Sequence, residues 1–291
     1  MTQALDLVVV PRVRDIGDGF LVRRALPHGR RQMVGPFIFF DHFGPVRHGP
    51  GQGMDVRPHP HIGLATVTYL FAGRIMHRDS LGSVQPITAG AMNLMTAGRG
   101  IAHSERTPDA ERAAGQAMLG LQSWIALPAD KEEIAPDFQH YAADGLPQVH
   151  DTGFSARVIA GNAFGKTSPV TMVSPWFYVE ATLAAGRSLP LDPEHEERAV
   201  YLVEGAIRIA GDEFTAPSLL IFRPADRITV TATQDARLML LGGTALEGPR
   251  HIWWNFVSSR RERIEQAKED WASGRFPPVP GETEFIPLPE R

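Results

Sequence analysis

Two short stretches of the chain carry paired side chains that could bind a metal ion. In Pro58–His61 two histidines stand two positions apart, and in His103–Glu105 a histidine and a glutamate have the same spacing. Side chains at positions i and i+2 of a β-strand point to the same face. If the two strands are neighbours in a barrel, we expect His59, His61, His103 and Glu105 to converge inside it. Three neutral imidazoles and one carboxylate suit Fe, Mn, Ni, Cu or Zn.

The alternative interpretation of a single His-x-His pair is a solvent-facing strand or a loop. The second pair, with the same spacing, favours a metal site over that alternative. We expect the other histidines to be surface or core residues, and among them His42 and His77 are the candidates for neighbours of the metal. His195-Glu196-Glu197 looks like half of another ligand set, but Pro224–Ile228, the expected partner region, has no histidine. We therefore expect a structural or surface role for it.

The amino-acid composition and the net charge exclude several kinds of site and partner. The chain has no cysteine, which excludes disulfides, zinc ribbons, iron–sulfur clusters and thiol catalysis. Four protein ligands on a six-coordinate ion leave two positions open, which favours a reactive metal over a structural one. The net charge of −4 gives no electrostatic reason to expect nucleic acid or an anionic membrane as a partner. Because no signal peptide or long apolar span is visible, we expect a soluble cytoplasmic protein.

Short β-strands must position these ligands. The chain has 28 glycines and 24 prolines, which separate short runs rich in Val, Ile, Thr, Tyr and Phe. This pattern is typical of a sandwich or barrel. Expected strands include Thr66–Phe71, Leu219–Phe222, Ile228–Thr233, which alternates apolar and polar residues, and Arg237–Leu241.

One heptapeptide occurs in similar form in both halves of the chain. Tyr69–Ile75 has the same tyrosine, leucine, glycine and isoleucine positions as Tyr201–Ile207. In each copy we expect a strand that reaches a glycine turn and resumes as a second strand. The match predicts two similar barrels in tandem. We place the metal-binding barrel in residues 1–140, and in residues 141–291 a second barrel without a complete metal site.

Helix is expected only near the end of the chain. Ser259–Glu262 fits a capping box, in which Ser259 would cap the helix start. Ile264, Ala267 and Trp271 would form one apolar face, and Gly274 followed by Pro277 would end the helix. The tail after Phe276 contains five prolines. We expect it to be extended and to pack on the first barrel; a disordered terminus is the alternative.

Several segments resemble the pirin family of the cupin superfamily in both their sequence and their order along the chain. They are Gly35–Pro45, His59–His61, Thr66–Tyr69, His77–Gly82, Met95–Glu105 and, similar to bacterial pirin-like proteins, Gly248–Ser259. The resemblance covers nearly the whole chain. It implies an all-β bicupin of two jelly-roll barrels with one metal, usually Fe(II), in the first barrel. The four ligands of the family fall on His59, His61, His103 and Glu105.

The chain departs from the family pattern beside the first histidine pair. Many pirins have Arg-Gly-Phe-Glu after the His-x-His, where this chain has Ile62-Gly63-Leu64-Ala65. The difference removes a charge pair near the site but no ligand. We therefore expect metal binding to persist while the surroundings of the metal are tuned differently.

The resemblance implies two functions of different classes. Some pirins are quercetinases. By this resemblance the chain would be a quercetin 2,3-dioxygenase that acts on a small aromatic or flavonol-like substrate. Glu105 would then be a catalytic residue that accepts a proton from the substrate hydroxyl. Other pirins are iron-containing, redox-sensitive regulators that bind a transcription factor or a metabolic enzyme. A metal-free scaffold is a third option, which the complete ligand set disfavours. We expect a monomer.

Overall fold

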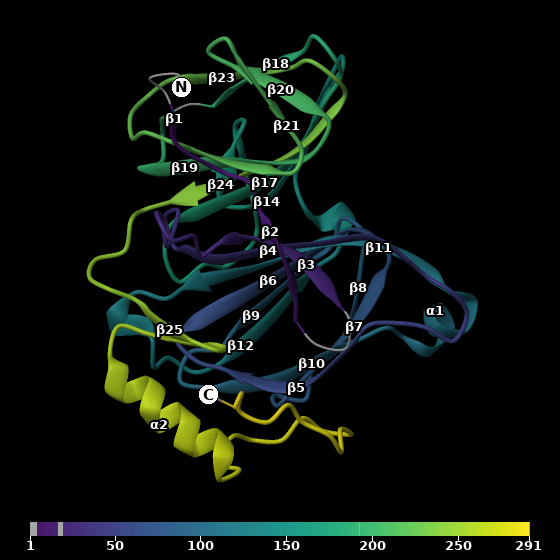
Figure 1. The fold of residues 1–291 in the computed structure, drawn as a ribbon, viewed down its shortest axis with the longest axis vertical. Helices are drawn as coiled ribbons and strands as arrows, with labels where there is room; N and C mark the ends of the chain where they lie inside the picture. The colour runs from purple at the N-terminus through teal and green to yellow at the C-terminus, as the bar shows by residue number, and fades with distance from the viewer. Residues whose placement is uncertain (1–4, 17–19, 192, 291) are drawn as a thin grey trace. The chain divides into compact units, whose positions relative to one another are not determined.

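The computed structural model of the chain describes residues 5–16, 20–191 and 193–290, and short β-strands make up most of them (Figure 1). The expected all-β fold is thus confirmed. Two α-helices are present among the described residues, α1 (Asp109–Ala114) and α2 (Arg261–Ala272), with single 3-10 turns at Ala129–Lys131 and Ala143–Gly145. Within the described residues, no helix is both long enough and apolar enough to cross a membrane.

Two sheets build the barrel that carries the histidine pairs. The larger has seven strands in the order β12 (Asp137–Tyr141), β9 (Met92–Thr96), β6 (Leu64–Ala72), β11 (Gln116–Ala126), β4 (Phe37–His48), β3 (Leu21–Leu26) and β2 (Arg12–Asp15). The smaller has four strands in the order β5 (Asp55–His61), β10 (Ile101–Arg106), β7 (Arg74–Asp79) and β8 (Val84–Thr88). A core cluster that includes Phe43, Leu70, Ile75, Ile87 and Met118 joins residues of both sheets.

The second barrel repeats this plan. Its larger sheet has the order β1 (Leu5–Val9), β22 (Ser218–Phe222), β19 (Glu197–Glu204), β24 (Ala236–Gly243), β17 (Trp176–Leu183), β14 (Phe154–Ala160) and β13 (Gln148–Asp151). Its smaller sheet has the order β18 (Ser188–Leu191), β23 (Ile228–Ala232), β20 (Ala206–Ile209) and β21 (Asp212–Thr215). Strand β23 alternates buried and less buried residues, as its sequence pattern predicts. Two short hairpins complete the list of strands, β15 (Asn162–Ala163) with β16 (Lys166–Thr167) and β25 (His251–Trp253) with β26 (Phe256–Ser258).

The repeated heptapeptide occupies equivalent places in the two barrels. Tyr69–Ile75 runs from β6 through Gly73 into β7, and Tyr201–Ile207 runs from β19 through Gly205 into β20. Both glycines have a positive φ, +90° at Gly73 and +84° at Gly205, where a side chain would be strained. The local sequence therefore predicted both the strand–glycine–strand unit and its duplication.

Each compact unit of the structure is discontinuous in sequence. One comprises residues 1–14, 23–40 and 144–246, and the other comprises 15–22, 41–143 and 247–291. Strand β1 accordingly pairs with β22, with Val9 opposite Leu219. The division of the chain at residues 140 and 141 stays a prediction about where one barrel sequence ends and the next begins.

Helix α2 begins later than the sequence indicated. Its N-cap is Arg260, and no side chain caps it, so the predicted capping box is wrong. The hydroxyl and amide of Ser259 instead bind the carboxylate of Glu132, 3.1 and 2.7 Å away. A buried carboxylate offers Ser259 a charge-assisted hydrogen bond, which is stronger than a cap to a neutral amide.

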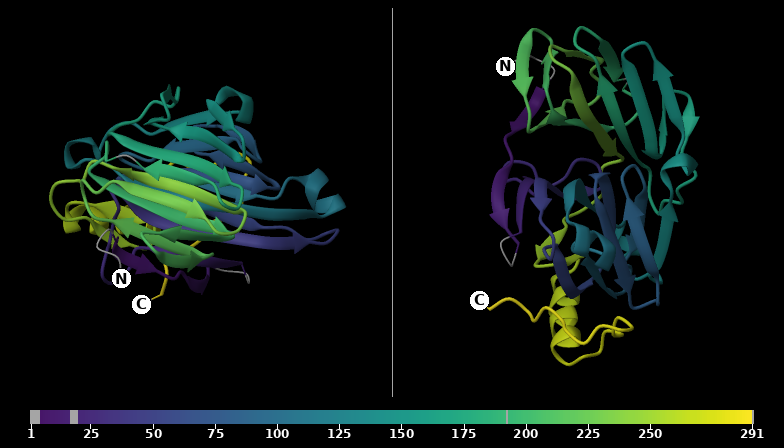
Figure 2. Two further views of the ribbon diagram at one scale, coloured as in Figure 1. Left: turned by 90° about the horizontal axis from the view of Figure 1, so that it is seen from above. Right: turned by 90° about the vertical axis from the view of Figure 1, so that its right-hand side faces the viewer.

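The C-terminal tail, residues 275–290, packs on the unit that contains the histidine pairs, as expected. In the right-hand view of Figure 2 the yellow tail passes beside helix α2 before it reaches the C-terminus. The indole N–H of Trp271 donates to the carbonyl of Ile286 at 2.9 Å. Phe276 and Leu288 belong to an apolar cluster with Ile62 and Phe256.

Candidate metal centre

The histidine pairs lie on adjacent antiparallel strands. His59 on β5 is directly opposite His103 on β10, and β10 also pairs with β7 on its other side. The side chains point toward the larger sheet, because the His61 ring lies edge-on to Trp124 of β11 at a centroid distance of 5.3 Å. The i, i+2 spacing and the strand register together therefore place the imidazoles inside the barrel.

A bulge interrupts the pairing of β5 with β10 beside the ligands. His103 is opposite His59, but Glu105 is opposite Val56, so β5 has an additional residue in this interval. Pro58 lies there, and proline has no N–H for the ladder. Bulges of this kind redirect side chains and are common next to functional sites.

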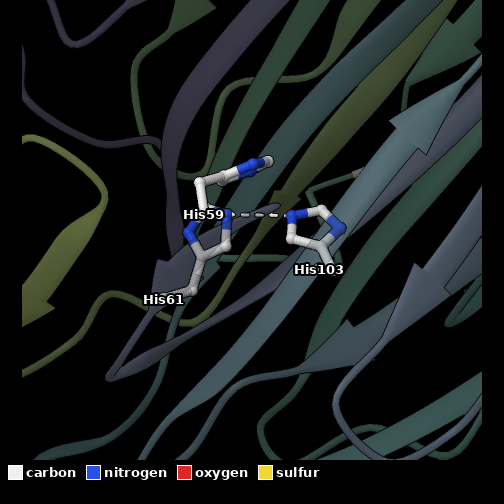
Figure 3. Close-up of side chains that lie close together, drawn as sticks. All are labelled: His59, His61 and His103. Atoms are coloured by element: carbon white, nitrogen blue, oxygen red, sulfur yellow. Dashed lines mark hydrogen bonds between the residues drawn. The ribbon is translucent and has the colours of Figure 1, made fainter. Parts of the chain in front are cut away.

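Three imidazoles meet within a small volume. The Nε2 atoms of His61 and His103 are 3.1 Å apart, and the dashed line in Figure 3 marks this contact. The ring of His59 lies 4.3 Å from that of His103 and 5.0 Å from that of His61, measured between centroids. One nitrogen from each histidine lies within 4.8 Å of the others, and all three side chains are buried. Such a group can hold one metal ion.

Backbone carbonyls set the tautomers of two of these histidines. The Nδ1 atom of His59 is 2.9 Å from the carbonyl oxygen of Arg57, and Nδ1 of His61 is 3.1 Å from that of Asn255. A carbonyl oxygen only accepts hydrogen bonds, so each Nδ1 carries the proton and each Nε2 presents a lone pair. This is the arrangement of metal-binding histidines, whose other nitrogen donates to an outer partner. The residues present therefore fit a metal ion.

Burial keeps the three imidazoles neutral. Desolvation lowers the pKa of His59 from 6.5 to about 4 and lowers the pKa values of His61 and His103 well below 6.5. Neutral imidazole is the form that coordinates a metal. At neutral pH no proton has to leave these nitrogens before a metal binds.

Glu105 lies on β10, two residues after His103. Its carboxylate accepts a hydrogen bond of 3.0 Å from Oγ1 of Thr68 on the facing strand β6, and it is 8% exposed. Burial raises its pKa above the usual 4.5. The compact group comprises His59, His61 and His103. Glu105 as the fourth ligand stays a prediction, based on its strand position and its inward-facing carboxylate.

His77 is confirmed as a neighbour of the site. Its ring lies 5.3 Å from that of His103, stacks on Phe138 at 4.4 Å, and its Nε2 is 3.1 Å from the carboxylate of Asp79. His42 is buried on β4. The Glu197 carboxylate accepts hydrogen bonds from Arg31 and from the amide of Gly35, which gives this part of His195-Glu196-Glu197 the expected structural role.

Sequence reasoning missed the contribution of the C-terminal hairpin. The carbonyl of Asn255, which fixes His61, lies in the turn between β25 and β26. Trp254 in this turn has φ +51°, a conformation that costs a residue with a side chain about 1–2 kcal/mol. The buried carboxylate of Glu132 binds the Ser258 hydroxyl at 2.8 Å and lies 3.3 Å from Nε of Arg250. A backbone carbonyl has no sequence signature, so nothing in the sequence indicated this role.

Gly63 shows how tightly the hairpin fits against the ligand strand. Its φ is +67°, and a Cβ atom there would lie 2.0 Å from the carbonyl oxygen of Val257. The amide of Val257 in turn donates to the carbonyl of Ile62 at 3.2 Å. The segment that departs from the usual pirin pattern thus meets the hairpin directly, and it needs glycine at position 63.

This combination of two jelly-roll barrels with a buried histidine cluster that could hold a metal ion defines a bicupin. Comparison with known families identifies the Pirin domain in residues 19–125 and the Pirin C-terminal cupin domain in residues 178–277. A pirin-like protein of Caulobacter vibrioides is 48% identical over 290 residues, which cover 98% of this chain and 100% of the relative. The chain belongs to the pirin family.

Solved structures agree with this assignment. The crystal structure of quercetin 2,3-dioxygenase from Acinetobacter baumannii matches with a TM-score of 0.90 and 36% identity, covering 98% of this chain and 95% of that one. A bacterial pirin from Escherichia coli in complex with nickel(II) has a TM-score of 0.64 and 17% identity over 82% of this chain and 99% of that one. The second likeness concerns the fold alone.

Proposed function

We propose that this protein is a metal-dependent dioxygenase that cleaves a flavonol such as quercetin with dioxygen and releases carbon monoxide. The observation that carries the proposal is the buried cluster of His59, His61 and His103. The cluster lies in a chain that is 36% identical, over nearly its full length, to a quercetin 2,3-dioxygenase. We propose Fe(II) as the metal and Glu105 as its fourth ligand; Mn, Ni, Cu and Zn suit the same donor set.

A divalent metal in this site would supply Lewis acidity and a template for the substrate oxygen. The chain itself supplies the remaining features. The buried histidines are neutral, so they would leave the charge of the metal only partly compensated by Glu105. A site with residual positive charge favours an anionic oxygen, such as that of a deprotonated flavonol hydroxyl.

We assign to Glu105 the acceptance of the hydroxyl proton of the flavonol. Burial raises its pKa, which makes the carboxylate a stronger base than an exposed glutamate. Thr68 donates to one of its oxygens at 3.0 Å and so fixes its orientation. Glu105 is therefore the proposed catalytic residue.

Oxygen uptake by Fe(II)-loaded protein, with and without quercetin, tests the proposal, and detection of carbon monoxide identifies the reaction. We expect quercetin-dependent uptake that falls by about 100-fold or more in Glu105→Gln at equal metal content, because an amide is no base. Glu204→Gln, in an exposed position of the second barrel, is the matched control. If metal-loaded protein consumes no oxygen with any flavonol, the dioxygenase proposal fails, and a redox-sensitive binding protein becomes the leading hypothesis.

A further inference from the structure

The outer face of strand β10 is covered by the C-terminal tail. Side chains alternate along a strand, so His103 and Glu105 face the interior, whereas Ser104 and Arg106 face the other way. Ser104 is nevertheless fully buried. Its hydroxyl donates to the carboxylate of Glu282 in the tail at 2.7 Å.

Glu282 binds both outward-facing residues of this part of β10. Besides Ser104, it accepts hydrogen bonds from Nε and Nη2 of Arg106, at 3.0 and 2.7 Å. The side chain of Glu282 is only 9% exposed. The hydrogen bonds from Arg106 lower its pKa, so the carboxylate is ionised at neutral pH. One side chain therefore holds the two residues that flank Glu105.

The tail also reaches the strand that carries His59. The amide of Ile286 donates to the carbonyl of Pro58 at 2.8 Å. Pro58 lies in the bulge, where the normal ladder between β5 and β10 is interrupted. The tail thus binds a backbone carbonyl at the bulge of β5, next to His59.

These polar contacts act together with apolar packing, since Phe276 and Leu288 of the tail lie in one cluster with Ile62 and Phe256. A cavity of about 730 Å³ lies beneath the tail, lined by Pro58 and Ala102 on the strands and by Phe276 and Val279 in the tail. Glu282 lines the same cavity, and its hydrogen bonds to Ser104 and Arg106 join the tail to β10 there.

We propose that the C-terminal tail is a brace for the metal centre and that Glu282 is its positioning residue. By fixing Ser104 and Arg106 from behind, Glu282 sets the position of His103 and Glu105 at the point where the bulge weakens strand pairing. The proposal rests on the metal site of the proposed function, but it does not depend on flavonol chemistry.

Titration of metal-free protein with Co²⁺ tests this role, because the visible bands of Co²⁺ report both affinity and coordination geometry. We expect Glu282→Gln to raise the dissociation constant about tenfold, the lower end of the effect of losing a direct partner of a ligand, because Glu282 acts through the residues that flank His103 and Glu105. The band pattern should also change. The matched control is Glu284→Gln, since Glu284 is 58% exposed and 4.0 Å from Arg106. This control should bind Co²⁺ as the wild type does.

Ser104→Ala provides a second variant that removes a single hydroxyl and keeps the tail charge. It should raise the dissociation constant about threefold or more, by loss of one charge-assisted hydrogen bond. If Glu282→Gln fails to fold, Ser104→Ala decides the question. Wild-type affinity and band pattern in every variant that folds would overturn the brace. Since Co²⁺ binding is read without oxygen or quercetin, a failure of the dioxygenase proposal is distinguishable from a failure of this one.

Discussion

At the scale of single residues, the candidate metal centre consists of three histidines that burial makes neutral, two of which are oriented by backbone carbonyls. His59 and His61 each place a protonated Nδ1 on a backbone oxygen. Their Nε2 lone pairs therefore face the interior of the barrel. The site is prepared for a metal before the metal arrives, which reduces the reorganisation needed on binding.

Replacing any one of these histidines by alanine should greatly weaken metal retention. Each substitution removes one nitrogen ligand from the cluster. We expect His59→Ala, His61→Ala and His103→Ala to lose most of their metal on gel filtration, and wild type to keep one ion per chain, as measured by elemental analysis. His150→Ala, at an exposed position, is the control. Two ions per wild-type chain, or full retention in all three variants, would contradict the assignment.

The metal-free protein should lose stability as the pH falls from about 6.5 to about 4. In the unfolded chain a histidine has a pKa of about 6.5, whereas burial lowers the pKa of folded His59 to about 4. Between these values the unfolded state binds more protons than the folded state, so the free energy of unfolding decreases with falling pH. The raised pKa of Glu105 acts in the opposite direction.

Comparison with His59→Ala isolates this contribution of His59. We expect urea unfolding of chelator-treated protein to show a shallower pH dependence in His59→Ala than in wild type across that window. The difference can reach about 1.4 kcal/mol per pH unit. Parallel curves for the two proteins would show that His59 has an ordinary pKa in the folded state.

At the scale of elements, the β25–β26 hairpin, which is distant from His61 in sequence, supplies the Asn255 carbonyl that binds Nδ1 of His61. Glu132 fixes this hairpin by binding Ser258, Ser259 and Arg250 together. Both members of the Glu132–Arg250 ion pair are buried, with side-chain exposures of 2% and 1%. A buried charge without its partner is costly, so this ion pair is expected to be sensitive to substitution.

Glu132→Gln should lower the free energy of unfolding by about 3 kcal/mol, because it removes the buried carboxylate that faces the Arg250 guanidinium. The adjacent Glu133 is the matched control. It pairs with Arg260 and Arg263 at 3.2 and 2.9 Å, but 46% of its side chain is exposed. Glu133→Gln should therefore cost less than about 1 kcal/mol. Chemical unfolding of both variants tests the contrast, and equal losses would refute it.

At the scale of the whole molecule, the first part of the chain contributes to both compact units. Phe37 packs on Trp176 and Tyr178, with ring centroids 5.7 and 5.4 Å apart, and Phe40 packs on Tyr201 at 4.7 Å. Strand β1 extends the sheet that contains β22. The unit built mainly from residues 144–246 therefore includes segments from before residue 41.

Residues 141–291 expressed alone should not show a cooperative thermal transition. The fragment lacks strand β1 and the phenylalanines that cover Tyr178 and Tyr201, so it exposes apolar core surface. The control is the full chain cut by a protease at a site introduced between residues 140 and 141, which keeps every element. We expect this cut protein to keep its near-ultraviolet circular dichroism. A cooperative transition in the isolated fragment would contradict the expectation.

The sequence by itself determined the strand content, the duplicated unit and the histidines that come together. Each of these depends on local periodicity: the i, i+2 spacing of His59 and His61 selects one strand face, and Gly73 and Gly205 mark equivalent turns. A strand pattern records which side chains share a face, and this information is local to a few residues.

Tertiary structure alone decided which distant groups complete the site. The carbonyl of Asn255 comes from 194 residues beyond His61, and Ser258 binds Glu132 across 126 residues. Ser259 illustrates the same point, since its local pattern predicted a helix cap, whereas in the structure its hydroxyl donates to the buried carboxylate of Glu132. Backbone carbonyls carry no residue signature, and long-range ion pairs depend on how the whole chain folds. The sequence therefore indicates the histidines of the candidate site, whereas the groups that hold them in place emerge only from the fold.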